Sequence, residues 1–198
     1  MIPRHLVIAM AVLLVAVLGL SAYAWHMRRT AATPVASTDT RPLAPPVAGP
    51  TERATLYVAH DDDGTLRPMF ALIPLPSGRQ QRAEELLRAL LSVYLDKSSP
   101  HVLGPGADIR SVFLVDPGVA VIDLNSAFAN THRSGVLVED LTVASLIHTI
   151  SANTPGIQKV RILVEGQERD TLAGHADLSG FYDVTAVNQL AAQLQATQ

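Results

Sequence analysis

Apolar residues recur along the chain at several spacings, and each spacing predicts a different kind of element. Leu6 to Trp25 is an unbroken run of twenty uncharged, mostly apolar residues, and a helix of that length spans about 30 Å, the thickness of a bilayer. Further along, β-branched runs predict strands, and apolar positions repeating every three to four residues predict helices. The pattern therefore indicates one membrane-length segment followed by a domain of strands and helices.

Five apolar or β-branched runs predict strands: residues 54–59, 66–73, 109–115, 119–124 and 157–164. The first two flank His60-Asp61-Asp62-Asp63-Gly64, in which Asp-Gly favours a hairpin turn. The next two flank Asp116-Pro117-Gly118, where proline fixes φ and glycine allows a positive φ. Two hairpins are expected, and a short segment at Thr171-Leu172 is a candidate to pair back with the fifth strand.

Three stretches predict helices. The clearest has a buried stripe at helical spacing, formed by Ala83, Leu86, Leu87, Leu90, Leu91 and Tyr94. Residues 138–152 and 184–195 predict two more. Because the strands come as hairpins and do not alternate strictly with helices, the expected fold class is α+β. We expect a mixed β-sheet of hairpins with helices packed on one face, preceded by one N-terminal transmembrane helix.

Composition divides the chain. Residues 27–53 are rich in Pro, Ala and Thr and are typical of a linker. The expected organisation is a transmembrane helix or signal segment over 1–26, the linker over 27–53, an α/β domain over 54–182 and a C-terminal helix over 183–198.

The N-terminal segment has two competing interpretations. Ala22-Tyr23-Ala24 resembles a cleavage site, which would release the domain as a secreted or periplasmic protein after Ala24. The length of the apolar run, and Tyr23 and Trp25 at the position of an interfacial aromatic belt, favour an uncleaved anchor. Arg28, Arg29 and Arg41 slightly outweigh Arg4, which by charge alone favours a cytoplasmic domain. We give more weight to the linker and the cleavage-like residues, which fit export.

Charge and cysteine content exclude several classes of function. After Thr30 the chain has 12 Lys plus Arg against 18 Asp plus Glu, a net charge of −6. Nucleic acid is therefore a poor partner, because phosphate recognition needs a basic face. The chain has no cysteine, which removes disulfides, thiolate metal sites and N-terminal lipidation. No cofactor is expected.

The sequence contains no convincing metal or nucleotide motif. Gly104-Pro105-Gly106 is followed by Ile109 at the third glycine position of a dinucleotide loop and is interpreted as a plain loop. Asp61 to Asp63 lacks the remaining ligands of a calcium loop, since Phe70 stands where glutamate is needed. The histidines of the domain are far apart in sequence, so none forms a local zinc pair.

Two catalytic arrangements have only weak support in the sequence. Ser126 and His148 lack the Gly-x-Ser-x-Gly elbow of an esterase. Asp123 with Glu139 or Glu165 provides the carboxylate pair that a cell-wall or sugar hydrolase needs, but the sequence does not set their separation. The chain is therefore expected not to be an enzyme, with such a hydrolase as the alternative.

The loop after the fourth strand is the candidate binding site. Asp123-Leu124-Asn125-Ser126 is typical of a chain reversal, because these side chains bond nearby backbone groups. A structural cap is the preferred interpretation. The alternative is a recognition surface on a rigid scaffold, formed by Asn125, Asn130, Thr131 and Arg133.

The chain resembles the GerMN domain, the sporulation and spore germination module of bacterial envelope proteins. The resemblance covers roughly residues 54–182, and four stretches carry it: Ala120 to Phe128, Glu139 to Ile150, Ile157 to Gly166 and Leu172 to Ser179. Two features differ from many relatives. There is no cysteine to lipidate, and Ser151-Ala152-Asn153-Thr154 replaces a more apolar helix end.

The resemblance implies a non-catalytic extracytoplasmic domain that takes part in envelope or sporulation assemblies. The expected partners are envelope proteins or cell-wall-associated assemblies, with the membrane contacted through the N-terminal helix. The family is similar in build to ring-forming modules, so a homo-oligomer is also among the expected partners. The expected location is the cell membrane, single-pass, with the domain outside the cytoplasm.

Overall fold

The structure is a computed structural model that describes residues 49–75 and 78–196. Within these residues, no helix combines the length and apolar character needed to cross a membrane. The apolar run and the linker to residue 48 lie outside the described residues.

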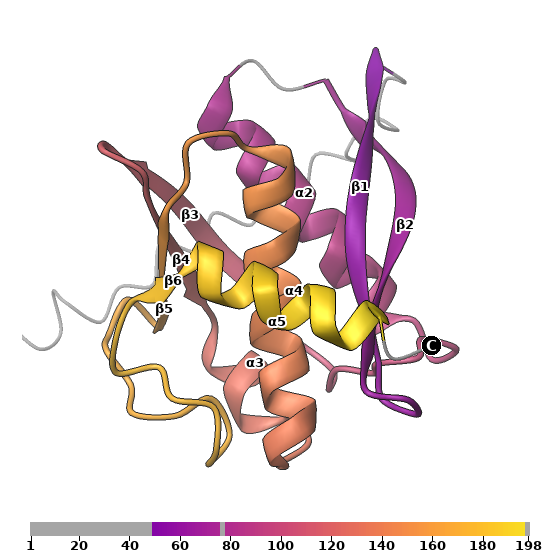
Figure 1. The fold of residues 1–198 in the computed structure, drawn as a ribbon, viewed down its shortest axis with the longest axis vertical. Coiled ribbons are helices and arrows are strands. Elements are labelled where there is room, and N and C mark those ends of the chain that lie inside the picture. The colour runs from indigo at the N-terminus through magenta and orange to yellow at the C-terminus, as the bar shows by residue number, and fades with distance from the viewer. Residues whose placement is uncertain (1–48, 76–77, 197–198) are drawn as a thin grey trace, which may run out of the picture. The chain divides into compact units, whose positions relative to one another are not determined.

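The described part contains two β-sheets and the helices around them (Figure 1). The strands are β1 (Thr51–His60), β2 (Thr65–Pro74), β3 (Ile109–Val115), β4 (Val119–Leu124), β5 (Lys159–Val164) and β6 (Tyr182–Asp183). The helices are α2 (Arg79–Leu95), α3 (Ser126–Asn130), α4 (Val136–Asn153) and α5 (Val184–Ala196). The α+β class is confirmed, as are both hairpins, because β1 pairs with β2 and β3 pairs with β4 in antiparallel register.

The prediction of one sheet that contains both hairpins is wrong. The second hairpin belongs to a four-stranded sheet of order β3-β4-β5-β6, which is mixed because β4 and β5 are parallel. The first hairpin is a separate two-stranded sheet. Helices α2 and α4 lie between the two sheets (Figure 1).

Side chains of α4 explain why the first hairpin stays separate. Ser145, Thr149 and Asn153 are four residues apart and therefore share one helix face. The Tyr57 N–H donates to Thr149 Oγ1 at 2.9 Å, and Ser145 Oγ donates to the Tyr57 carbonyl at 2.6 Å. Asn153 bonds both the N–H and the carbonyl of Thr55, at 3.2 and 2.7 Å. The outer edge of β1 is thus paired with helix side chains and is not free to accept another strand.

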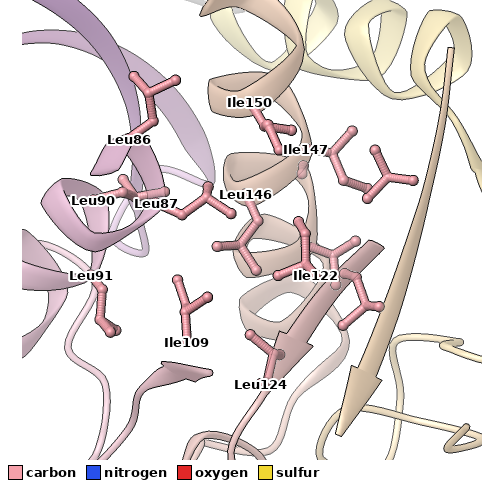
Figure 2. Close-up of a cluster of buried hydrophobic side chains, with 14 of the residues drawn as sticks. Leu86, Leu87, Leu90, Leu91, Ile109, Ile122, Leu124, Leu146, Ile147 and Ile150 are labelled. Atoms are coloured by element: carbon pink, nitrogen blue, oxygen red, sulfur yellow. The ribbon is translucent and has the colours of Figure 1, made fainter. Parts of the chain in front are cut away.

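One apolar core joins these layers. All six residues of the stripe predicted on the first helix are buried, and Leu86, Leu87 and Leu90 face side chains of α4 and of the four-stranded sheet (Figure 2). Burial of each such leucine contributes about 1.5–3 kcal/mol. The other core side chains labelled there are Leu91, Ile109, Ile122, Leu124, Leu146, Ile147 and Ile150.

Two local expectations need correction. The loop expected after the fourth strand is not all loop, because α3 forms within it. Thr171 forms an isolated bridge with Asp177 inside its own loop, so it does not pair back with β5. In contrast, the glycine at the Asp116-Pro117-Gly118 turn has the role expected of it. Gly118 has φ 75°, and a Cβ there would lie 2.6 Å from the Gly156 carbonyl oxygen.

Candidate functional site

Asn125 holds the start of α3 in place. Its Oδ1 accepts the N–H of Phe128 at 2.8 Å and that of Asp108 at 3.0 Å, and its Nδ2 donates to the Gly106 carbonyl at 2.8 Å. The first contact is an N-cap. Asn125 therefore has the structural role that the preferred interpretation gave it, and its side chain ties the loop before β3 to the loop after β4.

The other three candidate binding residues lie at the end of α3 and just after it, and they are exposed. Asn130 Oδ1 accepts a long contact of 3.5 Å from Arg169. Thr131 donates to the Ala127 carbonyl at 2.7 Å and packs on Gly104, where a Cβ would lie 2.1 Å from Thr131 Oγ1. Arg133 pairs with Asp61 at 3.1 Å. The structure thus connects this loop to the acidic turn between β1 and β2.

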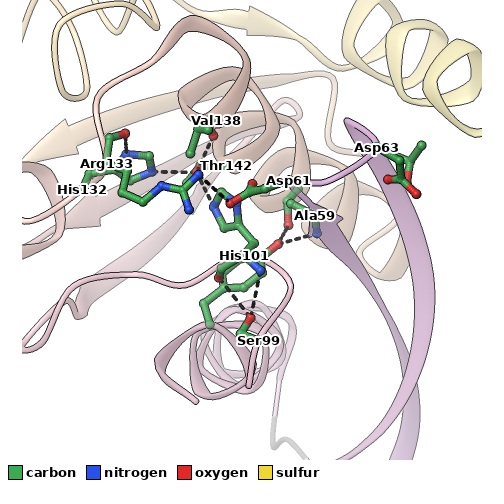
Figure 3. Close-up of polar contacts among 12 residues, drawn as sticks. Ala59, Asp61, Asp63, Ser99, His101, His132, Arg133, Val138 and Thr142 are labelled. Carbon is green, nitrogen blue, oxygen red and sulfur yellow. Dashed lines mark hydrogen bonds and ion pairs between the residues drawn. The ribbon is translucent and has the colours of Figure 1, made fainter. Parts of the chain in front are cut away.

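Arg133 belongs to a polar cluster, which we call the histidine joint and whose two histidines and threonine are buried: Asp61, His101, His132, Arg133 and Thr142 (Figure 3). Asp61 Oδ1 lies 2.6 Å from His101 Nδ1. Both histidine Nε2 atoms lie 2.7 Å from the single hydroxyl of Thr142. His132 Nδ1 lies 2.7 Å from the Arg133 carbonyl oxygen. The fold therefore brings together histidines that are far apart in sequence, which the search for local histidine pairs missed.

The joint has the hydrogen-bond order of an acid, a base and a nucleophile, yet the nucleophile is inaccessible. Thr142 has 0% of its surface exposed, and its hydroxyl also contacts the Val138 carbonyl at 3.0 Å. A hydroxyl buried inside a helix cannot meet a substrate carbonyl. Desolvation by burial lowers the pKa of both His101 and His132. The geometry fits a structural connection between segments better than it fits acyl transfer.

Glu139 is fully buried at the start of α4, where it holds the loop between β5 and β6. Its Oε2 accepts the backbone N–H groups of Ala173, His175 and Ala176 at 2.9, 2.9 and 3.0 Å, and its Oε1 lies 2.9 Å from His175 Nδ1. Desolvation raises the pKa of this carboxyl, but these hydrogen bonds outweigh it and lower the pKa to about 2. Glu139 is therefore a charged anchor for the loop at neutral pH.

Asp123 and Glu165 meet at the carboxyl ends of the parallel strands, where both pair with Arg110. Arg110 Nη1 lies 3.1 Å from Asp123 Oδ2 and 3.3 Å from Glu165 Oε2. Asp123 Oδ1 also accepts the Gly166 N–H at 2.7 Å. The backbone N–H of Ser126, at 2.7 Å, lowers the pKa of the Glu165 carboxyl. A glycosidase needs one carboxylic acid with a raised pKa, and neither Glu139 nor Glu165 has one.

The remaining candidate chemistry is also dispersed. His148 bonds Asn188 of α5 at 2.6 Å and packs edge-on against Tyr57, while Ser126 starts α3, bonded through its N–H to Glu165. In residues 49–75 and 78–196, no three His, Asp or Glu side chains are placed to hold a metal ion.

A protein-family model described as sporulation and spore germination, Germane, matches residues 55–170. Among solved structures, the tandem GerMN domains of the sporulation protein GerM from Bacillus subtilis are similar at TM-score 0.50 and 20% identity, covering 68% of this chain and 46% of that one. The first GerMN domain of the same protein gives 0.47 and 21%, covering 65% and 93%. A candidate lipoprotein from Clostridium perfringens gives 0.44 and 22%, covering 72% and 93%. No curated protein matches the chain.

Proposed function

The chain belongs to the sporulation and spore germination family that contains the GerMN domains, and from this premise we propose that it is a non-catalytic interaction module of the bacterial envelope. The family match over residues 55–170 is the observation that carries the proposal. The module is anchored by the apolar segment 6–25, which is long enough to span a bilayer. Its domain lies outside the cytoplasm.

The chemistry of the described carboxylates supports a non-catalytic role. Glu139 is occupied by backbone donors, and Asp123 and Glu165 share one guanidinium. The rival function is a hydrolase that uses Asp123 and another carboxylate on cell-wall sugars. The location of two carboxylates favours this rival: Asp123 and Glu165 lie at the carboxyl ends of parallel strands, where ligands often bind.

The proposed recognition surface is the exposed stretch from the last residue of α3, Asn130, to Arg133. Asn130 and Arg133 present polar side chains on a backbone fixed from two sides, by the Asn125 cap and by Glu139. A loop held by a rigid scaffold is suited to recognition, because little order is lost on binding. Envelope proteins or cell-wall-associated assemblies are the proposed partners.

In-cell crosslinking tests this surface. A photoreactive amino acid replaces Asn130 in the full chain, and the matched control carries it at Thr185, which is also exposed and lies on α5. We expect a discrete crosslinked partner from position 130 only. Adding Arg133→Ala should weaken that crosslink severalfold while lowering the free energy of unfolding by no more than about 1 kcal/mol, because Arg133 is the exposed partner of its ion pair with Asp61.

Two results would go against the proposal. Equal crosslinking from both positions, unchanged by Arg133→Ala, removes recognition from this loop. Turnover of purified peptidoglycan fragments by the full chain, abolished by Asp123→Asn, favours the hydrolase instead.

A further inference from the structure

The histidine joint connects the turn between β1 and β2, the loop after α2, and α4 together with the loop that precedes it. Asp61 comes from the turn between β1 and β2, His101 from the loop after α2, and Thr142 from α4. His132 and Arg133 come from the loop before α4. His101 is 1% exposed and His132 is 7% exposed. A change in the charge of either imidazole ring therefore affects the hydrogen bonds that hold these segments together.

The acceptors at the two ends of the joint fix the protons on both Nδ1 atoms. The Asp61 carboxylate, which also pairs with Arg133, needs a donor and receives it from His101 Nδ1. A backbone carbonyl only accepts, so His132 Nδ1 donates to the Arg133 oxygen. Each neutral ring then has a bare Nε2 that points at the Thr142 hydroxyl.

The Thr142 hydroxyl has one proton to give and three acceptors around it: two Nε2 atoms and the Val138 carbonyl. With both rings neutral, at least one Nε2 faces the hydroxyl oxygen without a proton between them. One added proton removes this defect, because the protonated ring donates to Thr142 and Thr142 donates to the other ring. One proton therefore fits the joint.

A second proton does not fit. It would place two imidazolium rings with centroids 6.0 Å apart, away from water, beside the Arg133 guanidinium. One carboxylate, Asp61, faces them directly, and Glu139 lies on the α4 side of His132. Tyr94 covers the α2 side of His101 with its ring at 4.7 Å, and burial keeps that phenol neutral by raising its pKa. Two buried like charges are costly unless each has a partner.

We propose that the histidine joint is an acid-sensitive latch: it stays closed with at most one proton added to the two Nδ1 protons of His101 and His132, and binding of a second added proton releases residues 131–135 from the Asp61 turn. When the joint is open, both histidines are in contact with water, and each binds a proton below about pH 6.5. Opening therefore takes up about one extra proton, and the opening constant rises by up to tenfold for each unit of pH below that value. The latch regulates the recognition surface proposed above, on which its biological use rests.

Amide hydrogen exchange of the full chain in detergent micelles tests the latch, with protection of residues 131–135 corrected for intrinsic exchange at each pH. We expect constant protection between pH 7.5 and 6.5 and a loss of about tenfold between pH 5.5 and 4.5. His132→Gln removes the second proton site and should make protection constant over the whole range. His60→Gln is the matched control, next to Asp61 but outside the joint, and should keep the wild-type dependence.

Protection that does not change with pH in the wild type overturns the proposal, and so does an unchanged dependence in His132→Gln. Histidine ¹⁵N spectra of the wild type give a second readout that needs no variant. They should show at most one Nε2 proton, in total, on His101 and His132 in the closed state, and two such protons with full protection contradict the latch. No partner is needed for these measurements, so failure of the recognition surface is separately detectable.

Discussion

At the scale of the residue, Glu139 makes the strongest testable contribution. Its carboxyl has a pKa of about 2 in the folded protein against an ordinary 4.5. A pKa lowered by folding stabilises the protein above pH 4.5, and this stabilisation is lost as the pH falls toward 2. The difference corresponds to roughly 3 kcal/mol at neutral pH.

Replacing Glu139 by glutamine should therefore lower the free energy of unfolding by roughly 3 kcal/mol at pH 7. Urea unfolding at pH 7 and at several values from 4.5 to 2 measures both the loss and its disappearance in acid. Glu165→Gln is the matched control, because this carboxylate is about half exposed and its loss should lower the free energy of unfolding clearly less than the loss of Glu139. Equal effects of the two variants would show that the loop does not depend on the buried carboxylate.

At the scale of the element, α4 closes the edge of β1 with a row of polar side chains. Thr149→Val keeps the shape of the side chain but leaves the Tyr57 N–H without its acceptor. An unpaired buried donor costs about 1–3 kcal/mol. Thermal unfolding should show this loss for Thr149→Val, while Ser151→Ala, on the same helix but off this row, should change stability by less. If Thr149→Val melts like the wild type, the helix side chains do not hold the hairpin.

Elements were more predictable from sequence than their assembly. Local patterns such as the leucine stripe of α2 and the turn at Gly118 determine where a helix or hairpin forms, and both were predicted. Separation of the first hairpin depends on Asn153 and its row, whose partners lie about ninety residues away. The polar C-terminal end of α4, which departs from the family pattern, is the feature of the sequence that points to this pairing of α4 with β1.

In the candidate site, too, the sequence predicts local contacts but not long-range ones. Asn125 was predicted as a cap from its immediate neighbours, and its cap bond spans only three residues. His101 and His132 meet across Thr142 through long-range packing, so no spacing rule finds them.

At the scale of the whole molecule, residues 49–75 and 78–196 form one domain held by its own core and charged loop anchors, and the proposed membrane anchor lies outside these residues. The match to the family model over residues 55–170 identifies the domain. The anchor and the side of the membrane are predictions from the sequence, and the proposed partners are accessible only if the domain is exported.

Surface labelling of spheroplasts tests this central claim. The chain has two lysines, Lys97 and Lys159, and both are exposed, so a membrane-impermeant amine reagent reports where the domain lies. We predict that both lysines are labelled in intact spheroplasts, on a protein that stays in the membrane fraction and begins at or near Met1. Labelling only after lysis, or a soluble protein that begins at Trp25, would contradict the account of a tethered extracytoplasmic module.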